Sequence, residues 1–353
     1  MINTESNRGY QQTIRLFPIS MQPFLPRVLL TNDDGPPDRK DSPYVFGLYL
    51  HLSQTLGWDV KVVLPSSQKS WIGKAYHIKE VATGVYYYPK SDGSQGETSP
   101  RPRPLKEDEL AEWILLDGTP ATCANVALHN LYPGQIDLVI SGPNYGRNTS
   151  SAFALSSGTI GAALSSSLSG VRSIAVSYGT VLRPTPPTLF EPAHLLSLKI
   201  LKDLWENWGN SGFPPHEVDL YNVNIPLIEQ LLSPEGLKVC WTKMWRNKYG
   251  SLFKAVSDNT DQRGVLAASP DSAPQDATSL SDAESNEPRH SLRFRFAPDI
   301  AGLISPNPAT LPVGSDGWAL SKGWASVTPL KASFGEPGHP FADDNLKGRL
   351  WKL

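Results

Sequence analysis

The first part of the chain alternates short apolar runs with a segment whose apolar residues recur at helical spacing. Residues 28–30 form a branched apolar run that is typical of a buried strand. Apolar residues then recur over 45–56 at the spacing of an amphipathic helix, with Ser42 as the expected N-cap and Gly57 as the stop. A second apolar run over 60–64 completes a strand–helix–strand unit. This unit predicts a parallel pair of strands.

The same alternation continues for about 200 residues. Gly158 follows Ser157 at the expected start of a helix made of small residues. Alternating strands and helices predict an α/β fold, which we expect to be a three-layer αβα, doubly wound, mostly parallel, Rossmann-like sheet. The further expected strands are 78–88, 113–116, 136–140, 171–177 and 220–225, and the further helices are 121–131, capped by Thr119, and 189–208.

The pattern changes after residue 235. Strands are expected at 237–245 and 292–296 without a helix between them, which predicts C-terminal antiparallel hairpin extensions, and a last strand is expected at 323–330. Residues 258–289 are rich in Ser, Asp, Ala, Pro and Glu, a composition that cannot bury a core and predicts a flexible insertion. The expected organisation is a flexible extension over 1–26, a core over 27–235, a hairpin region over 236–331 and a tail over 332–353.

Composition excludes several classes of protein. The 353 residues carry 32 basic and 34 acidic side chains, so no basic footprint for duplex nucleic acid is present. No run of 18 apolar residues exists and the first 24 residues lack the apolar core of a signal peptide, so we expect no membrane association and a cytoplasmic location. Cys123 and Cys240 lie outside any Cys-x-x-Cys motif and are expected to be reduced, structural thiols.

The first candidate site is the polar cluster that ends the first expected strand. There Asn32 is followed by Asp33, Asp34 and Gly35. Ligands of open parallel sheets bind at the carboxyl ends of the strands. Two adjacent carboxylates repel each other unless they are protonated or face a cation, and a hard divalent metal is the usual partner of such oxygens. The alternative is an ordinary polar turn after a strand.

The second candidate site is the glycine-rich stretch over 141–163. Ser157, Gly158 and Thr159 open the helix of small residues, so its free N–H groups and the positive end of its dipole suit a phosphate. The alternative is a glycine-rich turn with a small-residue helix packed tightly on the sheet. The loop over 66–73 leaves the second strand at the same edge of the sheet and can reach the acidic cluster.

Taken together and in order, several stretches resemble the SurE family of survival proteins, which are metal-dependent phosphatases and nucleotidases. The long N-terminal extension and the insertion resemble fungal-type members. The resemblance extends over residues 27–331, and the matching stretches are 30–35, 69–70, 118–120, 137–142 with Asn144, 157–163, 222–226 and 327–330.

The resemblance implies roles for particular residues. The implied metal is Mg²⁺ or Mn²⁺, and an all-oxygen set of ligands agrees with the preference of these ions. The implied metal ligands are Asp33, Asp34, Ser70 and Asn144; the implied catalytic residues are Asp33, Asp34 and Asn32; and the implied substrate-binding residues are Asn144, Asn148, Ser157, Gly158 and Thr159.

The resemblance also implies a reaction, which is hydrolysis of small phosphate monoesters such as nucleoside monophosphates by an activated water. This is the activity of an acid phosphatase or 5'(3')-nucleotidase. The hairpin region resembles the family's dimerisation arms, so a homo-oligomer, either a dimer or a tetramer, is expected. Loops 36–43 and 149–152 differ from the bacterial pattern, which leaves substrate preference open, and 331–336 lacks the histidine of some bacterial members.

Several alternatives stay open. The nucleophile could be an aspartate that forms an aspartyl-phosphate instead of a water. The protein could be a metal-dependent nucleoside hydrolase, or a binding or scaffold protein with a degenerate site. Trp245, Trp318 and Trp324 could stack on a base, although a core or interface role is favoured for each.

Overall fold

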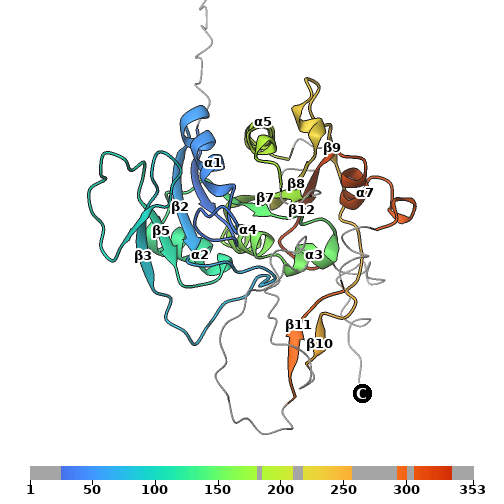
Figure 1. Cartoon of the computed structure of the whole chain (residues 1–353), viewed down its shortest axis with the longest axis horizontal. Coiled ribbons are helices and arrows are strands. Elements are labelled where there is room, and N and C mark those ends of the chain that lie inside the picture. Colours follow the sequence, from blue (N-terminus) through green and yellow to red (C-terminus); the bar gives the residue numbers. More distant parts are fainter. Residues whose placement is uncertain (1–24, 181–184, 210–217, 257–291, 300–305, 336–353) are drawn as a thin grey trace, which may run out of the picture.

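The computed structural model describes residues 25–180, 185–209, 218–256, 292–299 and 306–335 (Figure 1). The predicted insertion over 258–289 lies outside the described residues. So do residues 1–24 of the predicted extension and 336–353 of the predicted tail.

A ten-stranded sheet forms the centre of the described structure, and its strand order is β4-β3-β5-β2-β1-β6-β7-β8-β12-β9. The strands from β5 to β8 are parallel to one another, whereas β3 and β12 run antiparallel to their neighbours β5 and β8. This confirms the mostly parallel α/β prediction. The strands of the sheet are β1 (Arg27–Thr31), β2 (Asp59–Pro65), β3 (Gly84–Tyr88), β4 (Glu97–Ser99), β5 (Trp113–Leu116), β6 (Leu138–Tyr145), β7 (Arg172–Thr180), β8 (Leu220–Leu227), β9 (Val239–Trp241) and β12 (Ala325–Leu330).

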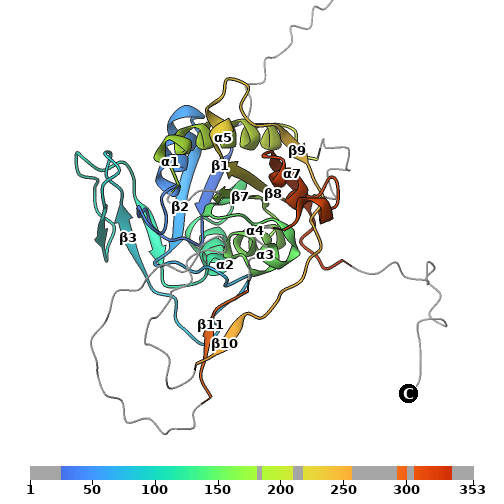
Figure 2. The same cartoon turned by 45° about the vertical axis from the view of Figure 1, so that its right-hand side comes forward.

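Helices cover both faces of the sheet (Figure 2). α1 and α5 lie on one face, and α2 and α4 lie on the other. None of the described helices is long and apolar enough to cross a membrane. The helices are α1 (Val45–Leu50), α2 (Pro120–Val126), α3 (Ser150–Ser156), α4 (Gly158–Leu168), α5 (Phe190–Glu206) and α7 (Asp316–Ser321); π-helical turns follow α1 (His51–Thr55) and α2 (Ala127–Leu131), and 3₁₀ turns lie at Pro187–Leu189, Glu229–Leu232 and Pro308–Thr310.

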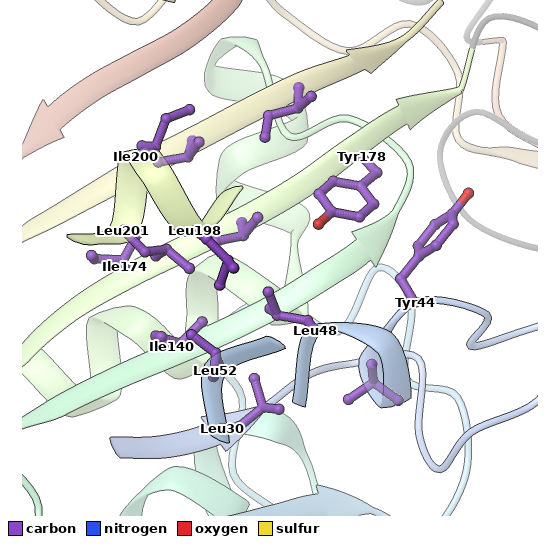
Figure 3. Packing of buried hydrophobic residues seen from close by; sticks show 14 of the residues in the cluster. Leu30, Tyr44, Leu48, Leu52, Ile140, Ile174, Tyr178, Leu198, Ile200 and Leu201 are labelled. Atoms are coloured by element: carbon purple, nitrogen blue, oxygen red, sulfur yellow. The ribbon is translucent and has the colours of Figure 1, made fainter. Parts of the chain in front are cut away.

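Alternation of side chains along β1 explains why its sequence reads as one apolar run. Leu30 packs in the larger core with Leu48 of α1 and Leu201 of α5 (Figure 3). Leu29 points to the opposite face and packs with Val139 of β6 and with α2. Because both faces are covered by helices, both sets of side chains in a strand must be apolar. The turn that follows β1 is therefore anchored at the centre of the sheet.

The first helix differs from the prediction at its start. Its N-cap is Tyr44, not Ser42. The Ser42 hydroxyl instead donates to the Gly35 carbonyl at 2.9 Å, so it supports the turn after β1. The predicted stop is present, since Gly57 follows the π-helical turn with a φ of +67°.

The segment between β2 and β5 also differs from the prediction. The strand expected over 78–88 is confined to β3, and a short strand that was not expected, β4, follows within 89–106. Both guanidinium ends of Arg103 donate to Glu109 at 2.6 Å. This pairing lowers the pKa of Glu109 to about 2. A partly buried ion pair therefore joins two parts of the segment between β4 and β5.

The C-terminal region matches the hairpin prediction only in part. β10 (Phe253–Ala255) and β11 (Phe294–Phe296) pair antiparallel in a ribbon that extends away from the sheet (Figures 1 and 2). β9 does not form a hairpin with them, because it pairs in parallel with β12 at the edge of the central sheet. The strand expected at 323–330 is confirmed as β12. The local pattern of apolar residues does not indicate which strands far apart in the chain will pair.

Candidate functional site

Asn32 shapes the turn that carries the two aspartates. Its Oδ1 accepts a hydrogen bond from the Gly35 amide at 3.0 Å, and its Nδ2 donates to the Gly35 carbonyl at 2.8 Å and to Ser42 Oγ at 3.3 Å. Gly35 has a φ of +88°, which favours glycine. Both polar atoms of Asn32 are therefore engaged in the turn. Its catalytic role stays a prediction, and the geometry describes a residue that positions its neighbours.

Asp33 lies against the N-terminus of α4. Its Oδ1 accepts a hydrogen bond from Thr159 Oγ1 at 2.6 Å, and the backbone amides of Gly158 and Thr159 also donate to this carboxyl group. A Cβ added at Gly158 would lie 2.7 Å from Asp33 Cβ, so the contact requires glycine there. Burial raises the pKa of Asp33, although these hydrogen bonds oppose the shift. The helix start thus faces an anionic group.

The start of α4 is the one that the sequence predicted. Ser157 is the N-cap, and its Oγ accepts a hydrogen bond from the Ile160 amide at 3.2 Å. Ser157, Gly158 and Thr159 are all buried. The structure therefore brings the predicted helix start together with Asp33, from the first candidate stretch.

Asp34 has one satisfied oxygen and one unsatisfied oxygen. Its Oδ2 accepts a hydrogen bond from the Tyr145 amide at 2.7 Å. Its Oδ1 is buried and has no hydrogen-bond partner in the described part of the chain. Burial, together with the neighbouring Asp33, raises the pKa of Asp34 well above its usual range. This carboxyl group therefore favours a proton or a cation.

Ser70 and Asn144 supply further oxygens at neighbouring strand ends. The loop after β2 is tied to the acidic turn, because the Lys69 amide donates to the Asp33 carbonyl at 2.7 Å. Ser70 Oγ is buried without a partner among the described residues. Asn144 lies past a register shift between β6 and β7, and its Nδ2 donates to the Gly146 carbonyl at 2.9 Å.

These oxygens fit the predicted metal. The carboxylates of Asp33 and Asp34, the hydroxyl of Ser70 and the amide oxygen of Asn144 are hard donors, which Mg²⁺ and Mn²⁺ prefer. Two of the oxygens, Asp34 Oδ1 and Ser70 Oγ, are buried and lack partners among the described residues. A buried oxygen without a partner is costly, and a cation would remove that cost. Within the described ranges no group of three or more His, Cys, Asp or Glu side chains is placed to hold a metal ion.

Asn148 is held by buried polar side chains of β7 and β8, and its predicted role in substrate binding stays a prediction. Its Nδ2 donates to Ser177 Oγ at 2.9 Å, and its backbone amide donates to Asn224 Oδ1 at 2.7 Å. Its backbone carbonyl accepts from Asn222 Nδ2 at 2.8 Å. The atom left without a described partner is Oδ1, which is buried. Oδ1 is an acceptor, so in this arrangement the Asn148 side chain faces a ligand hydroxyl or cation better than a phosphate oxygen.

Two residues near the site were not predicted. Trp71 follows Ser70 and has a φ of +62°, and the buried Asp316 accepts the backbone amide of Ser150 at 2.8 Å. Neither residue has a local signal, since one lies in a polar loop and the other reads as an ordinary first-turn residue of a helix. Two tryptophans that the sequence did single out pack on each other, with the Trp318 and Trp324 rings 5.4 Å apart.

Comparisons with known proteins agree on one family. The family described as "Survival protein SurE" matches residues 28–251. A yeast protein, the "Probable tubulin--tyrosine ligase PBY1" of Saccharomyces cerevisiae, is 33% identical over 89% of this chain. That match spans 42% of the yeast protein, so this chain covers less than half the length of that relative.

Bacterial relatives and a solved structure give the same result. The "5'-nucleotidase SurE" of Pelobacter propionicus is 29% identical over 67% of this chain and 78% of its own length. The protein of the same name from Campylobacter hominis is 33% identical over 57% of this chain and 66% of its own. The crystal structure of the SurE protein from Aquifex aeolicus matches with a TM-score of 0.55 and 23% identity, covering 92% of this chain and 100% of the other, which supports the fold. Because the family match covers more than half of its length, this chain belongs to the SurE family.

Proposed function

We propose that this chain hydrolyses phosphate monoesters, with nucleoside monophosphates as the substrate class, and that it depends on Mg²⁺ or Mn²⁺. The observation that carries the proposal is the pair of unpartnered oxygens, Asp34 Oδ1 and Ser70 Oγ, near the N-terminus of α4. The names of the bacterial relatives, which describe 5'-nucleotidases, support this reaction class. The yeast relative's name describes a protein that this chain matches over only 42% of its length, so a ligase activity is not proposed.

Four residues would hold the metal ion, namely Asp33, Asp34, Ser70 and Asn144. When bound, such an ion neutralises charge on the phosphoryl oxygens, which otherwise repel a nucleophile. The ion would also give Asp34 Oδ1 and Ser70 Oγ the partner that they lack.

The helix start would bind the phosphate. The amides of Gly158 and Thr159 and the Thr159 hydroxyl are donors at the positive end of α4, where an anion is favoured. They now donate to Asp33, which is itself an anion, so the same donors are suited to a phosphoryl oxygen close by. The missing Cβ of Gly158 allows Asp33 to lie close to these donors.

The aspartates would also handle the proton of the attacking water. A carboxylate of this pair would accept that proton as a general base. Attack by water is the proposed route. A covalent aspartyl-phosphate is the alternative, and transfer of labelled phosphate from substrate to protein would distinguish it.

Product analysis tests the proposal. The protein is incubated with AMP and with an aryl phosphate, each with Mg²⁺, with Mn²⁺ and after chelation, and inorganic phosphate, adenosine and adenine are measured. We expect phosphate and adenosine in equal amounts, only when metal is present. Release of adenine would identify a nucleoside hydrolase, and absence of turnover with both substrates would favour a binding or scaffold protein. The Asp33→Asn/Asp34→Asn double variant serves as the blank.

We also propose that the β10–β11 ribbon contributes to a homodimer or tetramer. The ribbon extends from the sheet (Figure 2). Phe253 and Phe294 on it are exposed. Contiguous exposed aromatic side chains are typical of surfaces that another protein covers. Light scattering of the full chain and of a Phe253→Ser/Phe294→Ser variant measures this, and we expect the variant to have the smaller mass. An unchanged mass would exclude the ribbon as an interface.

A further inference from the structure

Trp71 has a backbone conformation that does not suit a tryptophan. Its φ is +62°, in the left-handed region that favours glycine and is a clear outlier for a bulky residue. The loop holds this conformation from both sides. The Lys69 amide donates to the Asp33 carbonyl at 2.7 Å, and the Gly73 amide donates to the Ser156 carbonyl at 2.8 Å. Strain of this kind persists where the surrounding structure imposes it, and such positions cluster at ligand sites.

The Trp71 ring lies in a cluster of aromatic side chains from distant parts of the chain. The Phe153 ring of α3 is 6.1 Å away, the Tyr249 ring is 6.2 Å away, and the Phe296 ring of β11 is 5.2 Å away, measured between ring centroids. Phe153 is fully buried and anchors the cluster, whereas Trp71 and Phe296 are half-buried and Tyr249 is 40% exposed. The cluster therefore has a buried base and an accessible rim.

Tyr249 is fixed in place by α3. Its hydroxyl donates to the Ala152 carbonyl at 2.7 Å and also contacts Ser156 Oγ. The Asn247 side chain accepts from the Ala152 amide at 2.8 Å. The segment before the ribbon is thus docked on the helix that leads directly to Ser157. Tyr249 is therefore held in the rim of the cluster by hydrogen bonds to α3.

The cluster lies beside the candidate active site. Trp71 stands between Ser70, whose Oγ is buried at the site, and Ile72. A Cβ added at Gly158 would lie 3.0 Å from the Ile72 side chain and 2.7 Å from Asp33 Cβ, so Ile72 borders the same carboxylate. A phosphate held at the start of α4 must direct its ester group away from the buried aspartates. The adjacent aromatic rim is a surface that this group can contact.

We infer that Trp71, Tyr249 and Phe296 form a subsite that stacks the planar aromatic ring of the substrate's leaving group, the base of a nucleoside monophosphate. This inference rests on the proposed function and narrows it. Aromatic rings bind the faces of bases with little regard to base identity. The subsite therefore favours nucleotides over sugar phosphates without selecting one base.

The test compares two substrates that share the phosphate and the sugar. We measure kcat/KM for AMP and for ribose 5-phosphate with the full chain, Trp71→Ala, Trp71→Phe and Phe296→Ala. We expect Trp71→Ala to lower the ratio of kcat/KM for AMP to that for ribose 5-phosphate by about tenfold, mainly through KM. Trp71→Phe retains an aromatic face and should keep most of the ratio, and Phe296→Ala should lower it less than Trp71→Ala.

A matched control and a binding measurement complete the test. Trp241 is 47% exposed on β9 and packs on Tyr221, so Trp241→Ala should leave the ratio unchanged. Calorimetry with adenosine, which lacks phosphate, should show binding that Trp71→Ala weakens. An unchanged ratio, an equal loss for both substrates, or adenosine binding that ignores Trp71 would overturn the subsite. If the full chain hydrolyses neither substrate, the proposed function fails, and adenosine binding still decides the subsite.

Discussion

Two buried carboxylate regions of this protein are built in opposite ways. The carboxylate of Asp316, at the start of α7, accepts the backbone amides of Ser150 at 2.8 Å, Trp245 at 2.9 Å and Gly317 at 2.7 Å. The Asp33–Asp34 pair instead keeps Asp34 Oδ1 buried without a partner in the described structure. One region is saturated with hydrogen bonds and the other is not.

The segment over 145–150 is held between these two regions. The Tyr145 amide donates to Asp34 and the Ser150 amide donates to Asp316. Asn148 lies between them in a network of buried side chains. A saturated carboxylate stabilises a chain crossing, whereas an unsaturated one costs stability and is retained where a ligand completes it. The difference agrees with the proposal that Asp33 and Asp34 take part in the reaction, whereas Asp316 joins segments of the chain.

The largest expected effect is on activity, which should depend on Asp33 and Asp34 much more than on Asp316. Asp33→Asn and Asp34→Asn should each lower kcat/KM for AMP by more than about 100-fold, because each removes a charged ligand of the proposed metal ion. Asp316→Asn should lower it less than about tenfold, since Asp316 touches backbone only. Steady-state kinetics measures this. The exposed Asp38 in the next loop offers the control Asp38→Asn, which should be neutral. Equal losses at Asp34 and Asp316 would contradict the comparison.

The second expected effect is on stability, where a change at Asp316 should cost more than a change at Asp34. Asp316→Ala leaves the buried amides of Ser150, Trp245 and Gly317 without an acceptor and should lower the free energy of unfolding by about 3 kcal/mol. Asp34→Asn should not destabilise the metal-free protein, because it removes a buried charge. Urea unfolding of both variants checks this. A greater loss for Asp34→Asn than for Asp316→Ala would show that the acidic pair stabilises the fold.

The pH dependence of stability should also differ. Burial raises the pKa of Asp316 from 3.8 to about 6. The folded state therefore holds its proton more tightly than the unfolded chain does, so stability falls as pH rises from about 4 to about 6 and is level above. The change attributable to Asp316 is about 3 kcal/mol. The free energy of unfolding is measured against pH for the metal-free protein and for Asp316→Asn, and we expect it to change less with pH in the variant. Identical pH profiles would exclude Asp316 as the cause.

Stabilisation of the protein by a metal ion should depend on the Asp33–Asp34 pair and not on Asp316. At 100 times its dissociation constant, Mg²⁺ or Mn²⁺ should raise the free energy of unfolding by about 2.7 kcal/mol. Thermal unfolding with and without metal measures the shift. The shift should disappear in Asp34→Asn and persist in Asp316→Asn. A shift that survives Asp34→Asn would place the ion elsewhere in the protein.

The smallest expected effect compares two serines. Ser70 Oγ has no partner among the described residues, so Ser70→Ala should weaken metal binding by about tenfold and leave the metal-free stability unchanged. Ser315 caps α7, where its Oγ accepts the Trp318 amide at 3.2 Å, so Ser315→Ala should cost about 1 kcal/mol and leave metal binding unchanged. Metal titrations and urea curves of both variants measure these effects. If Ser70→Ala lowered stability and Ser315→Ala weakened metal binding, the roles assigned to the two serines would be wrong.

Much of the core and part of the site follow from local sequence. The apolar run before Asp33 predicts a strand buried on both faces, and β1 is such a strand. Ser157 followed by small residues predicts the N-cap and helix start of α4, and both are present. These features depend on neighbours within a few residues, where side-chain periodicity and capping are decided.

Other features depend on contacts between distant segments. β6 was expected to end at residue 140, yet it continues to Tyr145, where its amide meets Asp34. The helix α3 was not predicted, because Ser150 at its start, with a φ of +75°, is held by Asp316 from 166 residues away. Propensity carries no information about a partner that far along the chain.

By itself, the sequence determined most of the strands and helices of the core, the position of Asp33 and Asp34 at the end of the first strand, and the resemblance to the family. These follow from local periodicity and from short stretches in a set order. Only the tertiary structure decided which of the buried polar atoms are satisfied. It engaged Asn32 in a turn, left Asp34 Oδ1 and Ser70 Oγ without described partners, and placed Trp71 in a strained conformation. The reason is physical: the cost of a buried polar atom is decided by partners that distant strands bring to it.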